Sequence, residues 1–544
     1  MYIEKGEKMN KKLVLIFALI ISVFLVMGTA SAGFFDFLNG ENGSAESGSE
    51  LTIAASAVHG GEPEAGFDPL TGWATENGIE PLIQSRIFQK DTEGKLKNDL
   101  ATDYSVSDDL KTIDVTLRDD VKFTDNTTLT AKDIEFTYNT AKKNGVIDLS
   151  TMKNVTATDD THVQFTLEKP DSTFLYKLAQ LGIVPSDSYN NETYGQDPIG
   201  SGPYKLIQWD KGQQAIFEVN ENYYGNMPHY EKITDLFMDS ESALLAAKNG
   251  EADIIEVAPE YANETIEGMH TVIYPSVDMR GLYLPVTPET GEVSEIGSPI
   301  GNNVTSDLAI RQALSSAINR QEIIDSAFNG LGNASYYGIG NQLTWAPDEN
   351  IQDGNIDEAK EILSKGGWKD TNGDGILEKD GKTASFTLNY KANDLPSQAM
   401  AIQISEQAKE IGINITPEGN SMDKIMATLN TNPMIWAYGS TDPYSIYTMY
   451  DSEVAHAGFN NPGSYNNSAV DAMIEKAMSE DLDSSYESWS QVPQLANNDT
   501  PWLWVGSIDY VFFVSDDVDF SENTHTIYPH GGDVWGNVYD WKPI

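Results

Sequence analysis

The stretch DLAIRQALSSAINRQEIIDSAFNGLG, from Asp307 to Gly332, establishes that this chain builds amphipathic helices. Its apolar residues recur at the i, i+3, i+4, i+7 and i+8 spacing that places them on one face of an α-helix. They are Ile310, Ala313, Leu314, Ala317 and Ile318. Thr305, Ser306 and Asp307 are candidate N-caps, and Gly330 is a candidate stop signal. We therefore predict a helix that begins near Asp307 and buries one face in a core.

Other segments of the chain alternate between apolar and polar residues. Residues 112–117 and 163–167 have the period of two that is typical of a half-buried strand. Further helical patterns occur at 359–363 and 399–411, with a strand pattern at 384–390 between them. Because helices and strands are interleaved and no repeat of about 20 to 50 residues is visible, we predict an α/β fold.

Length and composition exclude several classes of protein. The 544 residues suffice for two or more domains with buried cores. Lys and Arg number 34 against 83 Asp and Glu, and the net charge of −49 repels nucleic acid and anionic membrane surfaces. The hydrophobic content of 40% is ordinary for a folded protein. Because Cys is absent, disulfide scaffolds, Cys-based metal sites and thiol nucleophiles are excluded.

The N-terminal residues 1–32 have the pattern of an export signal. A lysine pair precedes an apolar run, and Ala30-Ser31-Ala32 supplies the small residues of a cleavage site. In the alternative interpretation, residues 13–32 stay attached as a membrane anchor, because this segment is just long enough to span a bilayer. Residues 33–50, rich in Gly, Ser and Glu, form a linker. We expect an exported protein on the outer side of the cell membrane.

Catalytic motifs are absent from the sequence. It contains no GxxxxGK[ST], HExxH, GxSxG or GxGxxG, so we expect neither an enzyme nor a resident cofactor. Asp370, Asn372 and Asp374 match the first half of an EF-hand calcium loop, but its twelfth position is Gly381, where a bidentate Glu belongs. We favour a polar Asx-turn leading into the next strand over a weak calcium site.

Four stretches together resemble the family 5 solute-binding proteins of ABC importers, the peptide and nickel class. They occur in the order typical of that family and span essentially the whole chain that follows the linker. They are DDLKTIDVTLRDDVKFTDNTTLTAKDIEFTY (108–138), PIGSGPYKLIQWDKGQQAIFEVNENYYG (198–225), the stretch at 307–332 quoted above, and GWKDTNGDGILEKDGK (367–382).

This resemblance implies a two-lobed α/β fold of the periplasmic-binding-protein type II, with a subdomain inserted in lobe I. We place lobe I at residues 51–94, 198–288 and 509–544, the insertion at 95–197 and lobe II at 289–508. The resemblance also implies a ligand enclosed between the lobes by hinge closure. It implies a monomeric receptor whose partners are the permease and the ATPase of an ABC importer.

The ligand class depends on the segment WAYGSTDPY, Trp436 to Tyr444. Peptide-binding members of the family carry an Asp in a W-x-G-D pattern, which pairs with the amino terminus of the peptide. Here the third position after Trp436 is Gly439, and we expect Asp442 to cap a turn or helix start. Nickel-binding members carry a His in an H-A-x-F setting, which His456 matches. The resemblance thus implies a nickel ion or nickel chelate, with an oligopeptide or dipeptide as the alternative.

Further candidate site residues follow from position and side-chain chemistry. His59 follows the first predicted strand, where open α/β sheets bind ligands, and His530 lies in the terminal segment that returns to lobe I. Imidazole suits Ni(II), so both join His456 as candidate metal ligands. Arg280, on a predicted crossing strand, and Arg86 are candidate clamps for a carboxylate. The aromatic candidates for the cleft lining are Trp436, Tyr438 and Tyr447.

Two other classes of protein remain open. A structural cell-surface protein accounts for the export signal and the acidity, but it does not account for the four family-like stretches. A surface hydrolase needs a nucleophile or a metal motif that this sequence lacks.

Arg280 and Arg86 also have a structural interpretation, since ion pairs are common in so acidic a chain.

Overall fold

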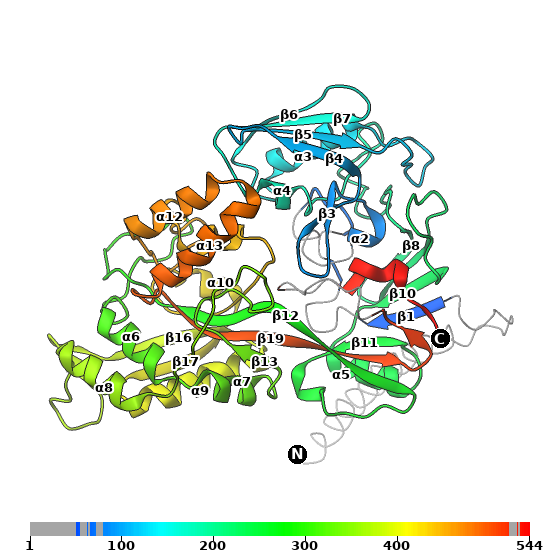
Figure 1. Cartoon of the computed structure of the whole chain (residues 1–544). Helices are drawn as coiled ribbons and strands as arrows, with labels where there is room; N and C mark the ends of the chain where they lie inside the picture. Colours follow the sequence, from blue (N-terminus) through cyan, green and yellow to red (C-terminus); the bar gives the residue numbers. More distant parts are fainter. Residues whose placement is uncertain (1–49, 55–61, 64–65, 72–79, 522–529, 531–533) are drawn as a thin grey trace, which may run out of the picture. The chain divides into compact units, whose positions relative to one another are not determined.

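The computed structural model describes residues 50–54, 62–63, 66–71, 80–521, 530 and 534–544 (Figure 1). The predicted export signal, residues 33–49 of the linker and the candidate ligand His59 lie outside these residues. In the part of the chain that the structure describes, no helix has the length and apolar character needed to cross a membrane. Residues from Glu50 onward form one unit, to which the description below applies.

A nine-stranded sheet runs through this unit in the order β18-β12-β19-β11-β1-β10-β9-β8, with β13 beside β19. Strand β1 pairs in parallel with β10 and β11, and the other neighbours are antiparallel. The strands are β1 (Glu50–Ala54), β8 (Tyr204–Asp210), β9 (Gln214–Val219), β10 (Lys232–Leu236), β11 (Ile254–Val257), β12 (Met269–Tyr283), β13 (Gly332–Ala334), β18 (Ile435–Tyr438) and β19 (Trp502–Ser515).

The two longest strands, β12 and β19, connect two hydrophobic cores. Val272 of β12 and Phe512 of β19 belong to one core, and Leu282 and Leu503 belong to the other. Strand β19 reads WLWVGSIDYVFFVS and is buried along most of its length, as expected for a strand covered on both faces. Arg280 lies on β12, so its predicted place on a crossing strand is confirmed.

A second sheet lies between residues 101 and 167. It is antiparallel in the order β4-β5-β7-β6, and helix α3 (Ala131–Asn144) packs against it (Figure 1). The strands predicted at 112–117 and 163–167 are confirmed as β5 and β7. The bounds are β4 (Ala101–Val106), β5 (Thr112–Leu117), β6 (Met152–Ala157) and β7 (His162–Leu167). This sheet falls within the predicted insertion, whose boundaries stay a prediction.

Helices and parallel strands surround the core that contains Leu282. Helix α6 (Leu308–Ala317) begins as predicted, with Asp307 accepting a hydrogen bond from the N–H of Ala309 at 3.0 Å. The pattern does not continue as one helix to Gly330. Ile318 is extended, and the side chain of Asn319 caps a new helix, α7 (Arg320–Ala327). The patterns at 359–363, 399–411 and 384–390 correspond to α8 (Ile356–Lys365), α9 (Leu395–Glu410) and β16 (Ser385–Lys391).

The remaining elements are short or cover these sheets. The helices are α2 (Glu80–Ile83), α4 (Phe174–Lys177), α5 (Ser240–Lys248), α10 (Met422–Met426), α11 (Tyr444–Tyr450), α12 (Ser468–Met478) and α13 (Leu482–Ala496), with 3₁₀ turns η2 (Pro259–Tyr261), η3 (Ser452–Val454) and η5 (Val534–Asp540). The strands are β2 (Phe88–Lys90), β3 (Leu96–Asn98), β14 (Glu378–Lys379), β15 (Lys382–Thr383), β17 (Asn414–Asn420), β20 (Val518–Asp519) and β21 (Lys542–Pro543).

Candidate functional site

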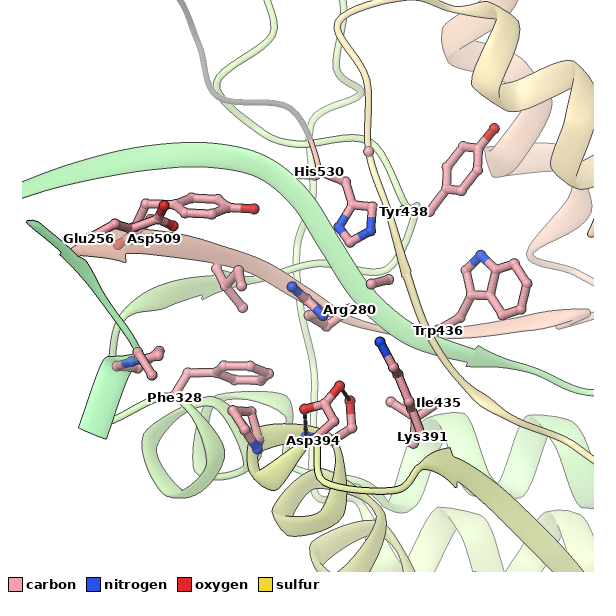
Figure 2. A pocket seen from close by; sticks show the side chains of 18 of the residues that line it. Glu256, Arg280, Phe328, Lys391, Asp394, Ile435, Trp436, Tyr438, Asp509 and His530 are labelled. Carbon is pink, nitrogen blue, oxygen red and sulfur yellow. Dashed lines mark hydrogen bonds between the residues drawn. The ribbon is translucent and has the colours of Figure 1, made fainter. Parts of the chain in front are cut away.

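A cleft of about 1160 Å³ lies where β12, β18 and β19 pass between the two cores (Figure 2). Small-molecule pockets are typically about 300 to 1,000 Å³, so this cleft is large. Its lining combines both signs of charge with apolar side chains. The cationic and His side chains are Arg86, Lys90, Arg280, Lys391 and His530, and the acidic ones are Asp239, Glu241, Glu256, Glu260, Asp394, Asp442 and Asp509.

A bulge in β12 shapes the middle of this cleft. The register with β19 shifts between Pro275 and Met279, so β12 carries extra residues there. The Ser276 hydroxyl donates to the carbonyl of Ile508 at 2.6 Å and accepts from the N–H of Asp278 at 2.9 Å. Bulges re-aim side chains next to binding sites, and here the bulge precedes Arg280.

The buried carboxylate of Asp278 gathers three side chains from three parts of the chain. It accepts hydrogen bonds from Nη2 of Arg280 at 2.6 Å and from the hydroxyl of Tyr510 at 2.8 Å. Its other oxygen lies 3.1 Å from Nδ1 of His530. Sequence reasoning missed Asp278 and Tyr510. The available signal was the i, i+2 spacing of Asp278 and Arg280, which places both on one face of a regular strand.

Arg280 stays charged at the cleft wall. Burial alone lowers the pKa of a guanidinium, but the Asp278 carboxylate and the neighbouring Tyr510 together raise the pKa of Arg280 above its ordinary value. Among the described residues, its Nε atom is buried and has no hydrogen-bond partner. Arg280 therefore keeps donor capacity beyond its ion pair.

Two acids in the cleft hold their protons more tightly than usual. Burial raises the pKa of Asp442 to about 7, although the N–H of Tyr444 and the charges of Lys90 and Lys177 act in the opposite direction. Asp442 accepts from that N–H at 2.9 Å and so caps the turn before α11, one of the two roles predicted for it; the N-cap residue of the helix itself is Pro443. Burial also raises the pKa of Asp509 to about 6.

Gly439 leaves no space for a side chain where the W-x-G-D pattern described above has its Asp. A Cβ atom on Gly439 would lie 1.8 Å from the carbonyl oxygen of Val277, in the β12 bulge. The Gly439 carbonyl also accepts a hydrogen bond from the N–H of His530 at 3.0 Å. The close approach of two backbones therefore requires Gly here.

The structure brings five of the eight predicted site residues to the cleft: Arg86, Arg280, Trp436, Tyr438 and His530. Tyr447 and His456 are not among its lining residues. The ring of Tyr447 packs 5.3 Å from that of Tyr444, and Nε2 of His456 lies 2.6 Å from the Ser464 hydroxyl. Burial lowers the pKa of His456. With His59 outside the described residues, His530 is the candidate metal ligand that faces the cleft.

The loop at Asp370 forms hydrogen-bonded turns outside the cleft. Asp370 accepts from the N–H groups of Gly373 and Gly375, and Asp374 accepts from that of Ile376. The carboxylates of Asp370, Asp374 and Glu378 lie within 4.8 Å of one another. The turn geometry agrees with the predicted Asx-turn, and Glu378, the ninth residue counted from Asp370, adds a third carboxylate to the loop.

Comparisons with known proteins agree with this architecture. The model of the bacterial extracellular solute-binding proteins, family 5 Middle, matches residues 95–467. The chain is 30% identical over 492 residues to Protein XP55 of Streptomyces lividans, covering 86% of this chain and 87% of that protein. It is 26% identical over 505 residues to the oligopeptide-binding protein AppA of Bacillus subtilis, covering 85% and 90%. It is 28% identical over 375 residues to the nickel-binding periplasmic protein of Escherichia coli, covering 66% and 69%.

Solved structures show the same two-lobed α/β fold. NikZ from Campylobacter jejuni in complex with Ni(L-His) superposes with a TM-score of 0.76 at 23% identity, covering 91% of this chain and 99% of that one. AppA from Bacillus subtilis in complex with a nonapeptide gives 0.72 at 24% identity, with the same coverage. The chain therefore belongs to family 5 of the bacterial extracellular solute-binding proteins.

Proposed function

We propose that this protein is the exported solute receptor of an ABC importer and that its cleft captures a small solute bearing carboxylates, with a nickel chelate as the first candidate. The observation that carries the proposal is the sharing of Asp278 by Arg280 and His530 at the cleft. The receptor delivers its solute to the permease and ATPase of the importer. The signal pattern of residues 1–32 supports delivery from outside the membrane.

Arg280 and His530 offer complementary chemistry to such a chelate. A charged guanidinium binds a carboxylate through strong, charge-assisted hydrogen bonds. A carboxylate on one ring nitrogen of a His fixes its tautomer, and the other nitrogen then serves as a metal ligand. His530 has this arrangement, with Asp278 beside Nδ1. The same cleft therefore suits both the organic part and the metal of a chelate.

A peptide is the second candidate, and the size of the cleft favours it. The volume of about 1160 Å³ and the mixed charges suit a longer zwitterionic solute. Against this candidate, Gly439 excludes a carboxylate from the position where peptide-binding relatives hold the amino terminus. In either case, a ligand that contacts both lobes favours the closed state by its differential affinity.

Calorimetry of the purified protein with Ni(II)–L-histidine and with di- to pentapeptides tests the ligand class. We expect the chelate to bind more tightly, and mass spectrometry with elemental analysis of copurified ligand should find nickel. Submicromolar affinity for a plain peptide, with no binding of the chelate, would reverse this order.

Single His variants identify the coordinating imidazole. The cleft geometry predicts that His530→Ala weakens chelate binding, whereas the family motif predicts that His456→Ala does so. His270→Ala is the matched control, because its exposed ring pairs with Asp516 at 3.2 Å and does not line the cleft. Unchanged chelate binding in both His530→Ala and His456→Ala would show that neither residue coordinates the metal.

A further inference from the structure

Three exposed apolar side chains gather on one wall of the cleft. Leu395 is 61% exposed, and Met422 and Phe459 are also exposed, yet all three line the same cavity. Trp436 also lines the cavity and lies beside Phe459, with ring centroids 5.4 Å apart. Large apolar side chains that share a concave surface are characteristic of binding sites. Leu395, Met422, Trp436 and Phe459 are called the apolar wall below.

The fold places Leu395 and Met422 just beyond the carboxyl ends of two parallel strands, with Trp436 on a third strand beside them. β16 and β17 pair in parallel, with Lys391 opposite Asn420, and Leu395 and Met422 follow shortly after these residues. A parallel bridge between Asn389 and Met434 brings β18, which carries Trp436, alongside β16. The carboxyl ends of parallel strands share one edge of a sheet, where α/β proteins bind ligands. The wall is therefore built on regular elements.

Cationic groups line the cleft together with the wall. Lys391 is the last residue of β16, four positions before Leu395, and Arg280 lines the same cavity (Figure 2). Asp394, between Lys391 and Leu395, is engaged as the cap of α9, since it accepts from the N–H of Ser397 at 3.0 Å and from its hydroxyl at 2.7 Å. The cleft thus combines cationic side chains, which can bind a carboxylate, with the apolar wall, which can bind an uncharged side chain.

We propose that the apolar wall receives an apolar amino-acid side chain of the same solute whose carboxylate Arg280 holds. The substrate class is then a carboxylate solute built from an apolar amino acid, either as a metal-chelating amino acid or as a residue of a peptide. This inference rests on the proposed function. Burial of a Leu side chain on the wall should tighten binding by about tenfold to a hundredfold relative to Gly.

Two matched pairs of probes test the apolar wall by calorimetry. One pair is the Ni(II) complexes of glycine and of L-leucine, and the other is Gly-Gly-Gly and Gly-Leu-Gly. We expect the leucine member to bind at least about tenfold more tightly in whichever pair binds. Leu395→Ser should abolish this preference. Met422→Ser provides a second variant, should the first fold poorly.

Leu245→Ser is the matched control. Leu245 is 60% exposed, as Leu395 is, but it lies on α5 and does not line the cleft, so its loss should change neither affinity. Two results would contradict the role of the apolar wall: equal affinity for the leucine and glycine members, or a leucine preference that persists in both wall variants. Either result would leave the proposed function unaffected. Absence of binding by all four probes also overturns the inference, whereas binding of Ni(II)–L-histidine to the same sample would leave the proposed function intact.

Discussion

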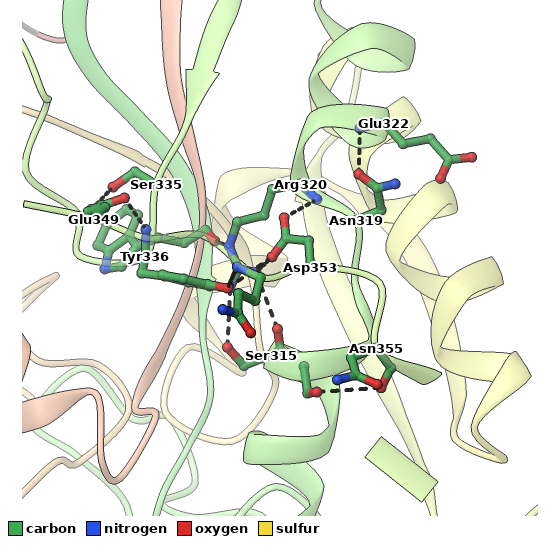
Figure 3. Close-up of polar contacts among 12 residues, drawn as sticks. Ser315, Asn319, Arg320, Glu322, Ser335, Tyr336, Glu349, Asp353 and Asn355 are labelled. Atoms are coloured by element: carbon green, nitrogen blue, oxygen red, sulfur yellow. Dashed lines mark hydrogen bonds and ion pairs between the residues drawn. The ribbon is translucent and has the colours of Figure 1, made fainter. Parts of the chain in front are cut away.

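Two buried ion pairs in this molecule have the same chemistry and different surroundings. Arg320 and Asp353 lie 2.5 Å apart, and Arg280 and Asp278 lie 2.6 Å apart. Arg320 is 1% exposed, and its remaining donors reach the Trp504 carbonyl at 2.7 Å and the carbonyl and hydroxyl of Ser315 at 3.2 and 3.1 Å (Figure 3). This guanidinium is fully engaged in holding loops and helices together.

Arg280 differs because the protein leaves part of its donor capacity unused. Its side chain is 12% exposed at the cleft, and Nε has no hydrogen-bond partner among the described residues. The pKa directions differ as well. Desolvation lowers the pKa of Arg320, whereas at Arg280 the combined effect of Asp278, Tyr510 and Asp394 exceeds desolvation and raises the pKa. The engaged donors of Arg320 support a structural role, and the unused donor of Arg280 supports the binding role proposed for it.

The largest effect is expected for Arg320→Met. Removing one partner of a buried ion pair leaves an uncompensated charge and costs about 3 to 5 kcal/mol of unfolding free energy. Urea denaturation at pH 7 should show this loss, while the folded fraction still binds ligand. Lys365→Ala, which removes the exposed pair with Glu361, is the control and should leave the urea midpoint unchanged. If Arg320→Met loses less than about 1 kcal/mol of unfolding free energy, the structural role assigned to Arg320 is wrong.

Arg280→Gln should weaken ligand binding, whereas Arg320→Met should not; Arg280→Gln should also cost stability, because it removes the guanidinium partner of the buried Asp278 carboxylate. Loss of a charge-assisted hydrogen bond to a carboxylate costs about 1.5 to 3 kcal/mol, so affinity for Ni(II)–L-histidine should fall by about tenfold to a hundredfold. Arg280→Lys keeps the charge without the planar fork and should give an intermediate affinity. Calorimetry and urea denaturation on the same samples separate the two effects. Unchanged affinity together with a stability loss as large as that of Arg320→Met would contradict the comparison.

Asp442→Asn should produce the smallest effect, and the effect should depend on pH. The folded-state pKa of about 7 lies above the ordinary Asp value of 3.8, so the contribution of Asp442 to stability is fully present below pH 3.8 and is lost as pH rises through 7. Asn has no charge to bury. The variant should therefore match the parent near pH 4 and exceed its unfolding free energy at pH 8, by on the order of 2 kcal/mol.

Urea denaturation between pH 4 and pH 8 measures how the unfolding free energy of each protein changes with pH. Asp239, which also lines the cleft, supplies the control, because the N–H of Ser242 lowers its pKa. Asp239→Asn should be less stable than the parent above pH 4, whereas Asp442→Asn should be more stable than the parent at pH 8. Parallel pH profiles for Asp442→Asn and the parent would show that Asp442 does not titrate near 7 in the folded protein.

Local signals predicted much of the secondary structure because near neighbours determine it. The spacing of Ile310, Ala313 and Leu314 and the cap at Asp307 located α6. The same reasoning did not separate α6 from α7, because Ile318 fits the apolar face while its backbone is extended. The turn depends on Asn319, whose side chain caps α7 by accepting from the N–H of Glu322.

The site was less accessible to such reasoning. A short motif singled out His456, but Nε2 of this residue lies against Ser464 and its side chain does not line the cleft. His530 had no local motif, and its position follows from contacts with Asp278 and Gly439, more than 90 residues away in the chain. Asp278 was missed because the β12 bulge, set by Ser276 and Ile508, is a property of two paired strands.

The sequence by itself determined the α/β class, the family, the acidity and the presence of Arg280 on a crossing strand, because periodicity, composition and ordered motifs are written along one chain. Tertiary structure alone decided which charges share the cleft, which Arg keeps donors for a ligand and which acids hold protons near neutral pH. These properties depend on desolvation and on pairing between residues far apart in the chain, and both arise only when the strands and loops are assembled.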